Sequence, residues 1–284
     1  MKEEMEMETE IYKAVFIRHK MSSTTEILEK LWNKRVIAIH YENIRSTNPD
    51  DYEDPAAKHA LNRLHTYCNQ GAVVGAIYRQ IRPAQILVGI IKKGSEIKIF
   101  DEYGDKYIYK TVQLQDTKEV SLLDYPLLGA IQPRLTAIAR WRGVSDLLWR
   151  IASNQRIPEN VKYLAPGQLE VVCQEYLRMK GILKFLLLPI GRNLQDIDIV
   201  GIGNDGGRVI AQVTQSKKQA KVDKKLRILE NYKGRGVKLI FFGPKSCNIT
   251  SGEVEYIPIE TIIPALISSQ VPIYSKAIDL LFNR

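Results

Sequence analysis

The chain has 284 residues, and a chain of this length usually forms two domains. Hydrophobic residues make up 45% and charged residues 26%, a balance that is typical of a protein with an apolar core and excludes a disordered or fibrous chain. Lysine and arginine outnumber aspartate and glutamate by 41 to 32, and the formal net charge of +9 makes nucleic acid the first partner to test.

Targeting signals and cysteine usage point to the cytoplasm. No apolar run approaches the length of about 18 residues that a membrane span needs, so no membrane association is expected. Residues 1–10, MKEEMEMETE, lack the basic start and apolar core of a secretory signal, and we expect a disordered tail there. The cysteines Cys68, Cys173 and Cys247 have neither a disulfide pattern nor zinc-ligand spacing.

The first half of the chain predicts a small, mostly β domain that ends near residue 142. An apolar run at 14–17 indicates a strand, and a helix is expected over 26–33, where apolar side chains recur on one face after a Ser/Thr run suited to N-capping. A strand at 35–41 and a second helix over 55–70 follow. Short segments rich in β-branched residues, separated by Gly, Pro and Asp turns, predict further strands at 73–78, 84–92, 96–100 and 107–114.

The second half predicts an α/β domain over residues 164–284, after a connector at 143–163 in which a helix is expected. Pro166 opens a helix that continues to about residue 180. Beyond it, the pattern predicts strands at 184–188, 197–201 and 208–214, a basic helix over 219–232, strands at 237–242 and 255–257, and a terminal helix near 273–282.

The most informative stretch is DIDIVGIGNDGGRVIAQVTQSKK, residues 196–218. Two predicted strands flank the turn at 204–207, whose Asn, Asp and Gly residues are typical of a hairpin. Side chains alternate between the two faces of a strand. A hairpin centred on this turn therefore places Asp198 opposite Gln212 or Thr214.

These residues, with two neighbours, suit phosphodiester hydrolysis. Asp198 and Glu170, which lies beside the apolar stripe of the preceding helix, are hard oxygen ligands of the kind that Mg²⁺ prefers. Gln212 supplies an amide, and Lys217 supplies a cation that stabilises charge in the transition state. Each residue also has a structural interpretation: Asp198 as an acid at a strand edge, and Glu170 as a complement to the helix dipole.

The predicted basic helix adjoins this group of residues. Lys218, Lys221, Lys224 and Lys225 belong to a segment where basic residues far outnumber acidic ones. They are expected to contact the phosphates of nucleic acid, which bind basic side chains irrespective of base sequence. A merely solvated helix face is the alternative.

Three short motifs follow one another in the second half: L-E at 169–170, D-I-V at 198–200 and A-Q-V at 211–213. Together they resemble the Mrr-type branch of the PD-(D/E)xK nuclease superfamily, which commonly uses Gln in place of its third acidic residue. The first half contains FIRHK, EKLWNKRVIAIHYENI, AQILVGII and IQPRLTAIARW, which look like the PUA/EVE-like domain fused to some of these nucleases.

The resemblance implies an α+β fold in two parts. Residues 11–142 would form a PUA/EVE-like β-barrel that reads nucleic acid, and residues 164–284 an α/β restriction-endonuclease-like domain with a central mixed sheet. The implied activity is that of a Mg²⁺-dependent endonuclease of type II or type IV, which restricts foreign, modified DNA in the cytoplasm. Cutting both strands of a duplex would favour a homodimer.

Aromatic residues of the first half are candidates for a base pocket, because aromatic faces stack on a flipped base. Tyr41 stands where the family has tryptophan in the corresponding strand. Trp32, Tyr78 and Arg18 are the other candidates, although the place of Trp32 on an apolar helix face favours a core residue.

One position departs from the family pattern. A Q-x-K motif would place lysine at position 214, where this chain has Thr214. Lys217 or Lys218 could fill the same space from further along the chain. A catalytically degenerate nuclease fold that binds nucleic acid is equally consistent, and it could be directed to RNA, which PUA-like domains often meet. DNA is the partner expected first.

Overall fold

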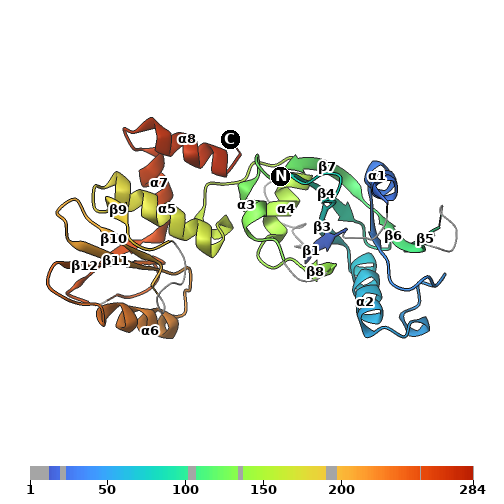
Figure 1. Cartoon of the computed structure of the whole chain (residues 1–284), viewed down its shortest axis with the longest axis horizontal. Coiled ribbons are helices and arrows are strands. Elements are labelled where there is room, and N and C mark those ends of the chain that lie inside the picture. The colour runs from blue at the N-terminus through green and yellow to red at the C-terminus, as the bar shows by residue number, and fades with distance from the viewer. Residues whose placement is uncertain are drawn as a thin grey trace, which may run out of the picture. The chain divides into compact units, whose positions relative to one another are not determined.

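The computed structural model describes residues 13–19, 24–101, 107–133, 137–189, 197–249 and 251–283. The chain divides into two compact units, Met1–Ile157 and Pro158–Arg284 (Figure 1). The tail predicted at 1–10 lies outside the described residues. No helix in the described ranges is both long and apolar enough to span a bilayer.

The larger sheet of the first unit has five strands in the order β7-β4-β3-β1-β8. Strands β1 and β3 are parallel, and the other neighbours are antiparallel. The central strands are continuous runs of buried residues, because both faces of this part of the sheet are covered. The strands are β1 (Lys13–Arg18), β3 (Ala72–Ile77), β4 (Gln85–Ile91), β7 (Gln115–Ser121) and β8 (Ile138–Arg140).

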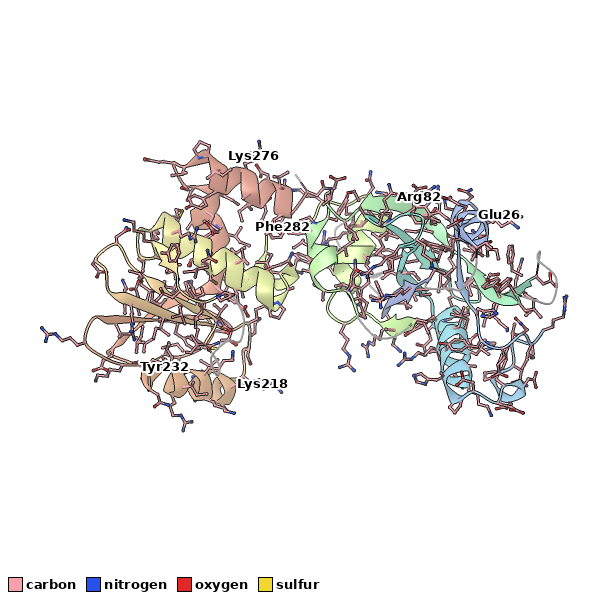
Figure 2. The ribbon with its side chains drawn as sticks, viewed as in Figure 1. Glu26, Arg82, Lys218, Tyr232, Lys276 and Phe282 are labelled. Atoms are coloured by element: carbon pink, nitrogen blue, oxygen red, sulfur yellow. The ribbon has the colours of Figure 1, made fainter. Side chains whose placement is uncertain are left out.

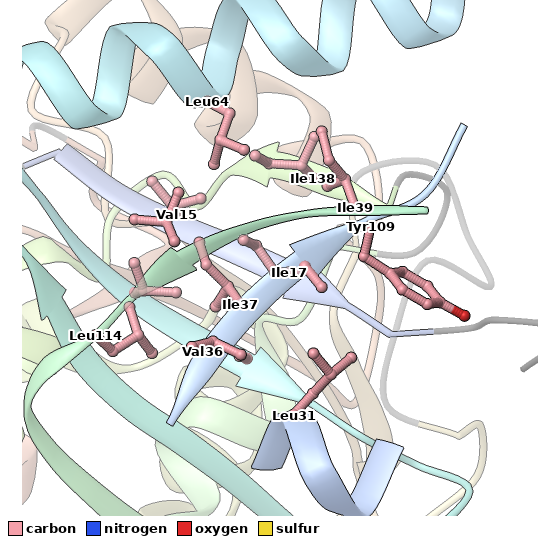
Figure 3. Packing of buried hydrophobic residues seen from close by; sticks show 14 of the residues in the cluster. Val15, Ile17, Leu31, Val36, Ile37, Ile39, Leu64, Tyr109, Leu114 and Ile138 are labelled. Carbon is pink, nitrogen blue, oxygen red and sulfur yellow. The ribbon is translucent and has the colours of Figure 1, made fainter. Parts of the chain in front are cut away.

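A smaller antiparallel sheet in the order β2-β6-β5 completes the β structure of the described part of this unit. Figure 3 shows side chains of both sheets, together with Leu64 of the second helix, packed into one apolar core. The unit is thus a mixed α+β domain, and closure of its sheets into a barrel stays a prediction. The strands are β2 (Val36–Ile39), β5 (Lys98–Phe100) and β6 (Tyr109–Gln113), and the helical segments are α1 (Thr25–Asn33), η1 (Pro49–Asp51), α2 (Pro55–Gln70), α3 (Pro126–Ala130) and α4 (Ser145–Ala152).

Some elements of the first unit are absent from the sequence-based expectation. Strand β7 reads QDTKEVS and buries only Val120 fully, because it is an edge strand whose side chains largely face solvent. The pattern also predicts neither α3 nor β8. Helix α4, by contrast, is the helix expected within the connector segment, and it packs against β3 and β4 of the larger sheet.

His19 joins the two sheets of the first unit. Its Nε2 accepts a hydrogen bond of 3.0 Å from the Ala38 N–H of β2, and its ring stacks on Tyr78 with the ring centres 3.8 Å apart. The Tyr78 hydroxyl in turn donates to the Val36 carbonyl at 2.5 Å. Burial lowers the pKa of His19 to about 3, so the ring is neutral and can accept this bond.

The second unit is built on a five-stranded mixed sheet in the order β13-β12-β11-β10-β9. Strands β11, β12 and β13 are parallel, whereas β10 and β9 are antiparallel to their neighbours. A central mixed sheet is what the family resemblance implies for this unit. The strands are β9 (Phe185–Leu186), β10 (Ile199–Ile202), β11 (Arg208–Val213), β12 (Val237–Gly243) and β13 (Val254–Pro258).

Helices cover both sides of this sheet, with α5 on one side and α6 on the other (Figure 1). Helix α6 is held by Val222, Leu226 and Leu229, which share a core with Leu239 and Phe241 of β12. Helix α7, which the sequence does not predict, packs against α5. The helical segments are η3 (Val161–Tyr163), α5 (Pro166–Met179), α6 (Gln219–Glu230), η4 (Ile259–Thr261), α7 (Ile262–Ile267) and α8 (Pro272–Leu281).

Lys110 of β6 is a cation inside the first unit, with 1% of its surface exposed. Its Nζ donates to the Tyr41 carbonyl at 3.4 Å and lies 4.9 Å from the centre of the Tyr52 ring. Burial lowers the pKa of Lys110 from 10.5 to about 8, because the charged form loses its hydration.

We expect this lysine to make the free energy of unfolding of the first unit vary with pH in the alkaline range. The unfolded chain keeps the ordinary lysine pKa, so between about pH 8 and 10.5 the unfolded state binds more protons than the folded state. The free energy of unfolding should therefore rise with pH in this window, by about 1.4 kcal/mol per pH unit from this residue. Urea unfolding of the wild type and of Lys110→Met should differ by this slope; identical slopes would contradict the expectation.

Candidate active site

The hairpin of the second unit brings Asp198 against Gln212. Ile199 pairs with Ala211, and the Asp198 N–H donates to the Ala211 carbonyl at 3.1 Å just before β10 begins. In this register Asp198 lies opposite Gln212 near the carboxyl end of β11. This is one of the two pairings that the side-chain alternation predicts.

The Asp198 carboxylate is held by two donors from β11. Its Oδ2 accepts the Val213 N–H at 2.7 Å and the Gln212 Nε2 at 2.5 Å. The side chain is buried, and hydrogen bonds to an ionised carboxylate are among the stronger ones in proteins. Asp198 is therefore fixed in orientation at the end of the sheet.

Gln212 carries a buried oxygen that lacks a donor. Its Nε2 is used twice, toward Asp198 and toward the Val213 carbonyl at 3.0 Å. Within the described ranges, its Oε1 has no hydrogen-bond partner, and the residue is fully buried. An unsatisfied buried acceptor costs about 1–3 kcal/mol, so this oxygen marks a place where a donor or a cation would bind favourably.

A pocket of about 220 Å³ opens beside these residues. It brings together Glu170 of α5, Asp198, the end of β11 and Lys225 of α6. Burial, followed by the charges of Asp198 and Glu170, raises the pKa of the Cys173 thiol well above its ordinary value. Both predicted carboxylates therefore lie close to the same buried thiol and line the same pocket.

The cation in this pocket is Lys225. Its Nζ donates to the Val213 carbonyl at 3.4 Å, and among the described residues it has no carboxylate partner. Lys217, the lysine expected here from the sequence, is exposed and does not line the pocket. Thr214 is buried, and its Oγ1 accepts the Ser216 N–H at 3.2 Å.

The two carboxylates of the pocket are ligands of the kind that Mg²⁺ prefers. Mg²⁺ binds through one or two carboxylates and retains several waters, so Asp198 and Glu170 are sufficient as charged ligands. In the part of the chain that the structure describes, no three His, Cys, Asp or Glu side chains gather to hold a metal ion. A third protein ligand would then be the unsatisfied Oε1 of Gln212.

The other lysines predicted to contact nucleic acid lie on the exposed side of α6. Lys218 is its N-cap, and Lys221 and Lys224 are exposed along it. Figure 2 shows Lys218 and Tyr232 at the two ends of this helix. The same helix thus presents cations to solvent and one cation to the pocket.

The residues predicted to form a base pocket have different surroundings. Trp32 and Tyr78 are 2% and 0% exposed, and their rings meet edge to face in the core with centres 5.3 Å apart. Neither ring has a face free for a base. Tyr41 is half-buried at the border of this core, and half-buried Arg18 donates to the Pro133 carbonyl at 2.5 Å.

Comparisons with known proteins give weak similarities. No protein-family model and no curated protein matches the chain. A repair endonuclease from Pyrococcus abyssi is similar at 14% identity over 61% of this chain and 72% of its own, with a TM-score of 0.19. The complex of EndoMS with double-stranded DNA is similar at 13% identity over 61% and 71%, with a TM-score of 0.22. At these scores neither establishes a shared fold, so the functional inference depends on the pocket.

We expect Asp198 to be required for binding of a divalent cation. Asp198→Asn keeps the size of the side chain but removes the ligand charge, so Mn²⁺ affinity measured by calorimetry should fall at least about tenfold. Asp205→Asn is a matched control, because Asp205 caps the Gly207 N–H at 2.9 Å in the hairpin turn and does not line this pocket. Equal Mn²⁺ affinity of the wild type and Asp198→Asn would refute the assignment.

Proposed function

We propose that this protein is a Mg²⁺-dependent endonuclease that cleaves phosphodiester bonds in DNA. The observation that carries the proposal is a pocket lined by two carboxylates and a lysine, with an unsatisfied amide oxygen beside it. Hydrolysis of a phosphodiester needs a cation site for the phosphoryl oxygens and further positive charge for the transition state. Asp198 and Glu170 meet the first need, and Lys225 meets the second.

Each residue has a role set by its surroundings. A bound Mg²⁺ ion would polarise the phosphate and lower the pKa of a bound water. Asp198 and Glu170 hold the cation, and Gln212 orients Asp198 through its Nε2. The Lys225 ammonium, held by the Val213 carbonyl, is available to pair with a phosphate oxygen. The apolar side chains of Pro166 and Leu169 line the same pocket and strengthen these electrostatic interactions by excluding water.

DNA as the substrate is supported by charge. The chain carries a net charge of +9, and the exposed lysines of α6 lie on the helix that also supplies Lys225 to the pocket. Contacts of exposed lysines with successive phosphates would hold a strand irrespective of its sequence. Cleavage of both strands of a duplex would then require two copies of the site, for which a homodimer is the simplest arrangement.

The finer biological role that we propose is restriction of modified DNA, with the first unit as a PUA/EVE-like reader. The sequence motifs of the first half and its mixed α+β structure support this role. Tyr41 follows β2 and is only half-buried, so it is the residue with which we expect a flipped base to stack.

We expect purified protein to cleave DNA in Mg²⁺ and to be inactive in a chelator. Lys225→Met should lower the single-turnover rate about a hundredfold or more, because positive charge is lost where negative charge develops. Lys217→Met should change this rate little, since Lys217 lies outside the pocket. A larger loss of rate in Lys217→Met than in Lys225→Met would instead assign the stabilisation of the transition state to Lys217. A wild-type protein that binds DNA but cleaves neither modified nor unmodified duplex would favour the degenerate-nuclease alternative.

We also expect selection and affinity to reside in different units. Tyr41→Ala should reduce the preference for modified over unmodified duplex by about 1–3 kcal/mol, the value of stacking one base. Replacing Lys218, Lys221 and Lys224 with Gln should weaken binding to both duplexes alike and flatten the log–log salt dependence by about 0.9 per lost phosphate contact. Fluorescence anisotropy over a salt series measures both effects. If Tyr41→Ala and the triple lysine variant lost the preference for modified duplex equally, selection and affinity would not reside in different units.

A further inference from the structure

Gln215 connects the two elements that carry the proposed metal ligands. It follows Thr214 at the end of β11 and lines the pocket. Its Nε2 donates to two backbone carbonyls of the segment before α5, at 2.8 Å to Val161 and at 3.2 Å to Leu164. One side-chain amide thus uses both of its hydrogens on a single turn of chain.

The segment that Gln215 binds leads directly into α5. It consists of η3 and the residues up to Ala165, and Val161, Tyr163 and Leu164 in it are buried. The Ala165 N–H donates to the Gln168 Oε1 at 3.1 Å, which fixes the first turn of α5 to this segment. Glu170 lies on the next turn, so the bonds from Gln215 constrain the part of α5 that carries this carboxylate.

The two carboxylates are positioned by different means. Asp198 is fixed to β11 by hydrogen bonds in the hairpin, whereas Glu170 is carried by a helix that packs against the same strand. Side-chain packing allows more sliding than a hydrogen-bond ladder with a defined register. A polar link from the strand to the start of α5 would remove this freedom.

We propose that Gln215 is a positioning residue of the candidate site, and that its two hydrogen bonds hold Glu170 at the distance from Asp198 that a divalent cation requires. The proposal rests on the proposed function, since it presupposes that both carboxylates bind the metal. Gln215 itself need not touch the ion. Supporting residues of this kind typically change metal affinity tenfold to a hundredfold when they are replaced.

The test is Mn²⁺ affinity, measured by calorimetry on the full chain. Gln215→Leu keeps the approximate size of the side chain and removes both donors, so affinity should fall by about ten- to a hundredfold. Gln219→Leu is the matched control. Gln219 also donates two hydrogen bonds, to Asp223 Oδ1 at 2.7 Å and to the Asn248 carbonyl at 2.8 Å, and it lies outside the pocket.

A double variant identifies the route of the effect. If Gln215 acts through Glu170, then Gln215→Leu combined with Glu170→Gln should bind Mn²⁺ as weakly as Glu170→Gln alone. Additive losses would overturn the proposal, and so would an equal loss of affinity in Gln219→Leu, which would indicate a general loss of structure. Thermal unfolding checks that each variant folds, and Gln215→Met replaces Gln215→Leu if the latter does not.

The failure of this inference differs from the failure of the proposed function. A wild-type protein that binds no Mn²⁺ would overturn both. Wild-type binding with unchanged affinity in Gln215→Leu would overturn the positioning role alone. Raising the Mg²⁺ concentration should also restore DNA cleavage in Gln215→Leu, because a displaced ligand lowers affinity without removing a charge; no recovery at saturating metal would overturn the role as well.

Discussion

The hydrogen bonds from Val213 and Gln212 to the Asp198 carboxylate depend on the register of one hairpin. A shift of a single residue would turn the side chain of Asp198 to the other face of the sheet. Two features secure the register. Gly206 adopts a φ of 79°, which the turn requires and which suits glycine. Gly201 lies so close to β9 that an added Cβ would stand 2.4 Å from the Phe185 carbonyl oxygen.

The same hairpin explains which part of the candidate site can be predicted from the sequence. Its turn residues and its alternation of polar and apolar side chains are local signals, so the pairing of Asp198 with Gln212 follows from them. Lys225 is different, because its position depends on how α6 docks against the sheet. Lys217 is closer along the chain to Thr214, yet it lies in the exposed stretch before the helix begins.

In the first unit, local sequence patterns do not distinguish every aromatic residue that packs in the core from one that could bind a ligand. Tyr78 is a base-pocket candidate from the sequence, whereas the apolar helix face of Trp32 favours the core. The rings of both residues are buried in the core cluster that α1 and both sheets share. Burial of the Tyr78 ring is possible because its hydroxyl finds the Val36 carbonyl. Strand β7 is missed for a different reason. It is an edge strand, which needs few buried residues, so its sequence is mostly polar and lacks the apolar pattern of a strand.

The candidate site therefore combines a rigid part with a part that depends on packing. Asp198 and Gln212 belong to one hairpin, and hydrogen bonds within that hairpin set their geometry. Glu170 and Lys225 come from the helices on the two sides of the sheet, so their distances to Asp198 follow the docking of α5 and α6. Helix α6 is held by an apolar face built around Val222, Leu226 and Leu229.

Helix α5 has an additional constraint from the segment that precedes it, which consists of η3 and the residues up to Ala165. Gln215 binds this segment at the carbonyls of Val161 and Leu164. Any displacement of this segment must therefore either break these bonds or move the start of α5. Since Glu170 lies within two turns of that start, the position of its carboxylate depends on how this segment is held.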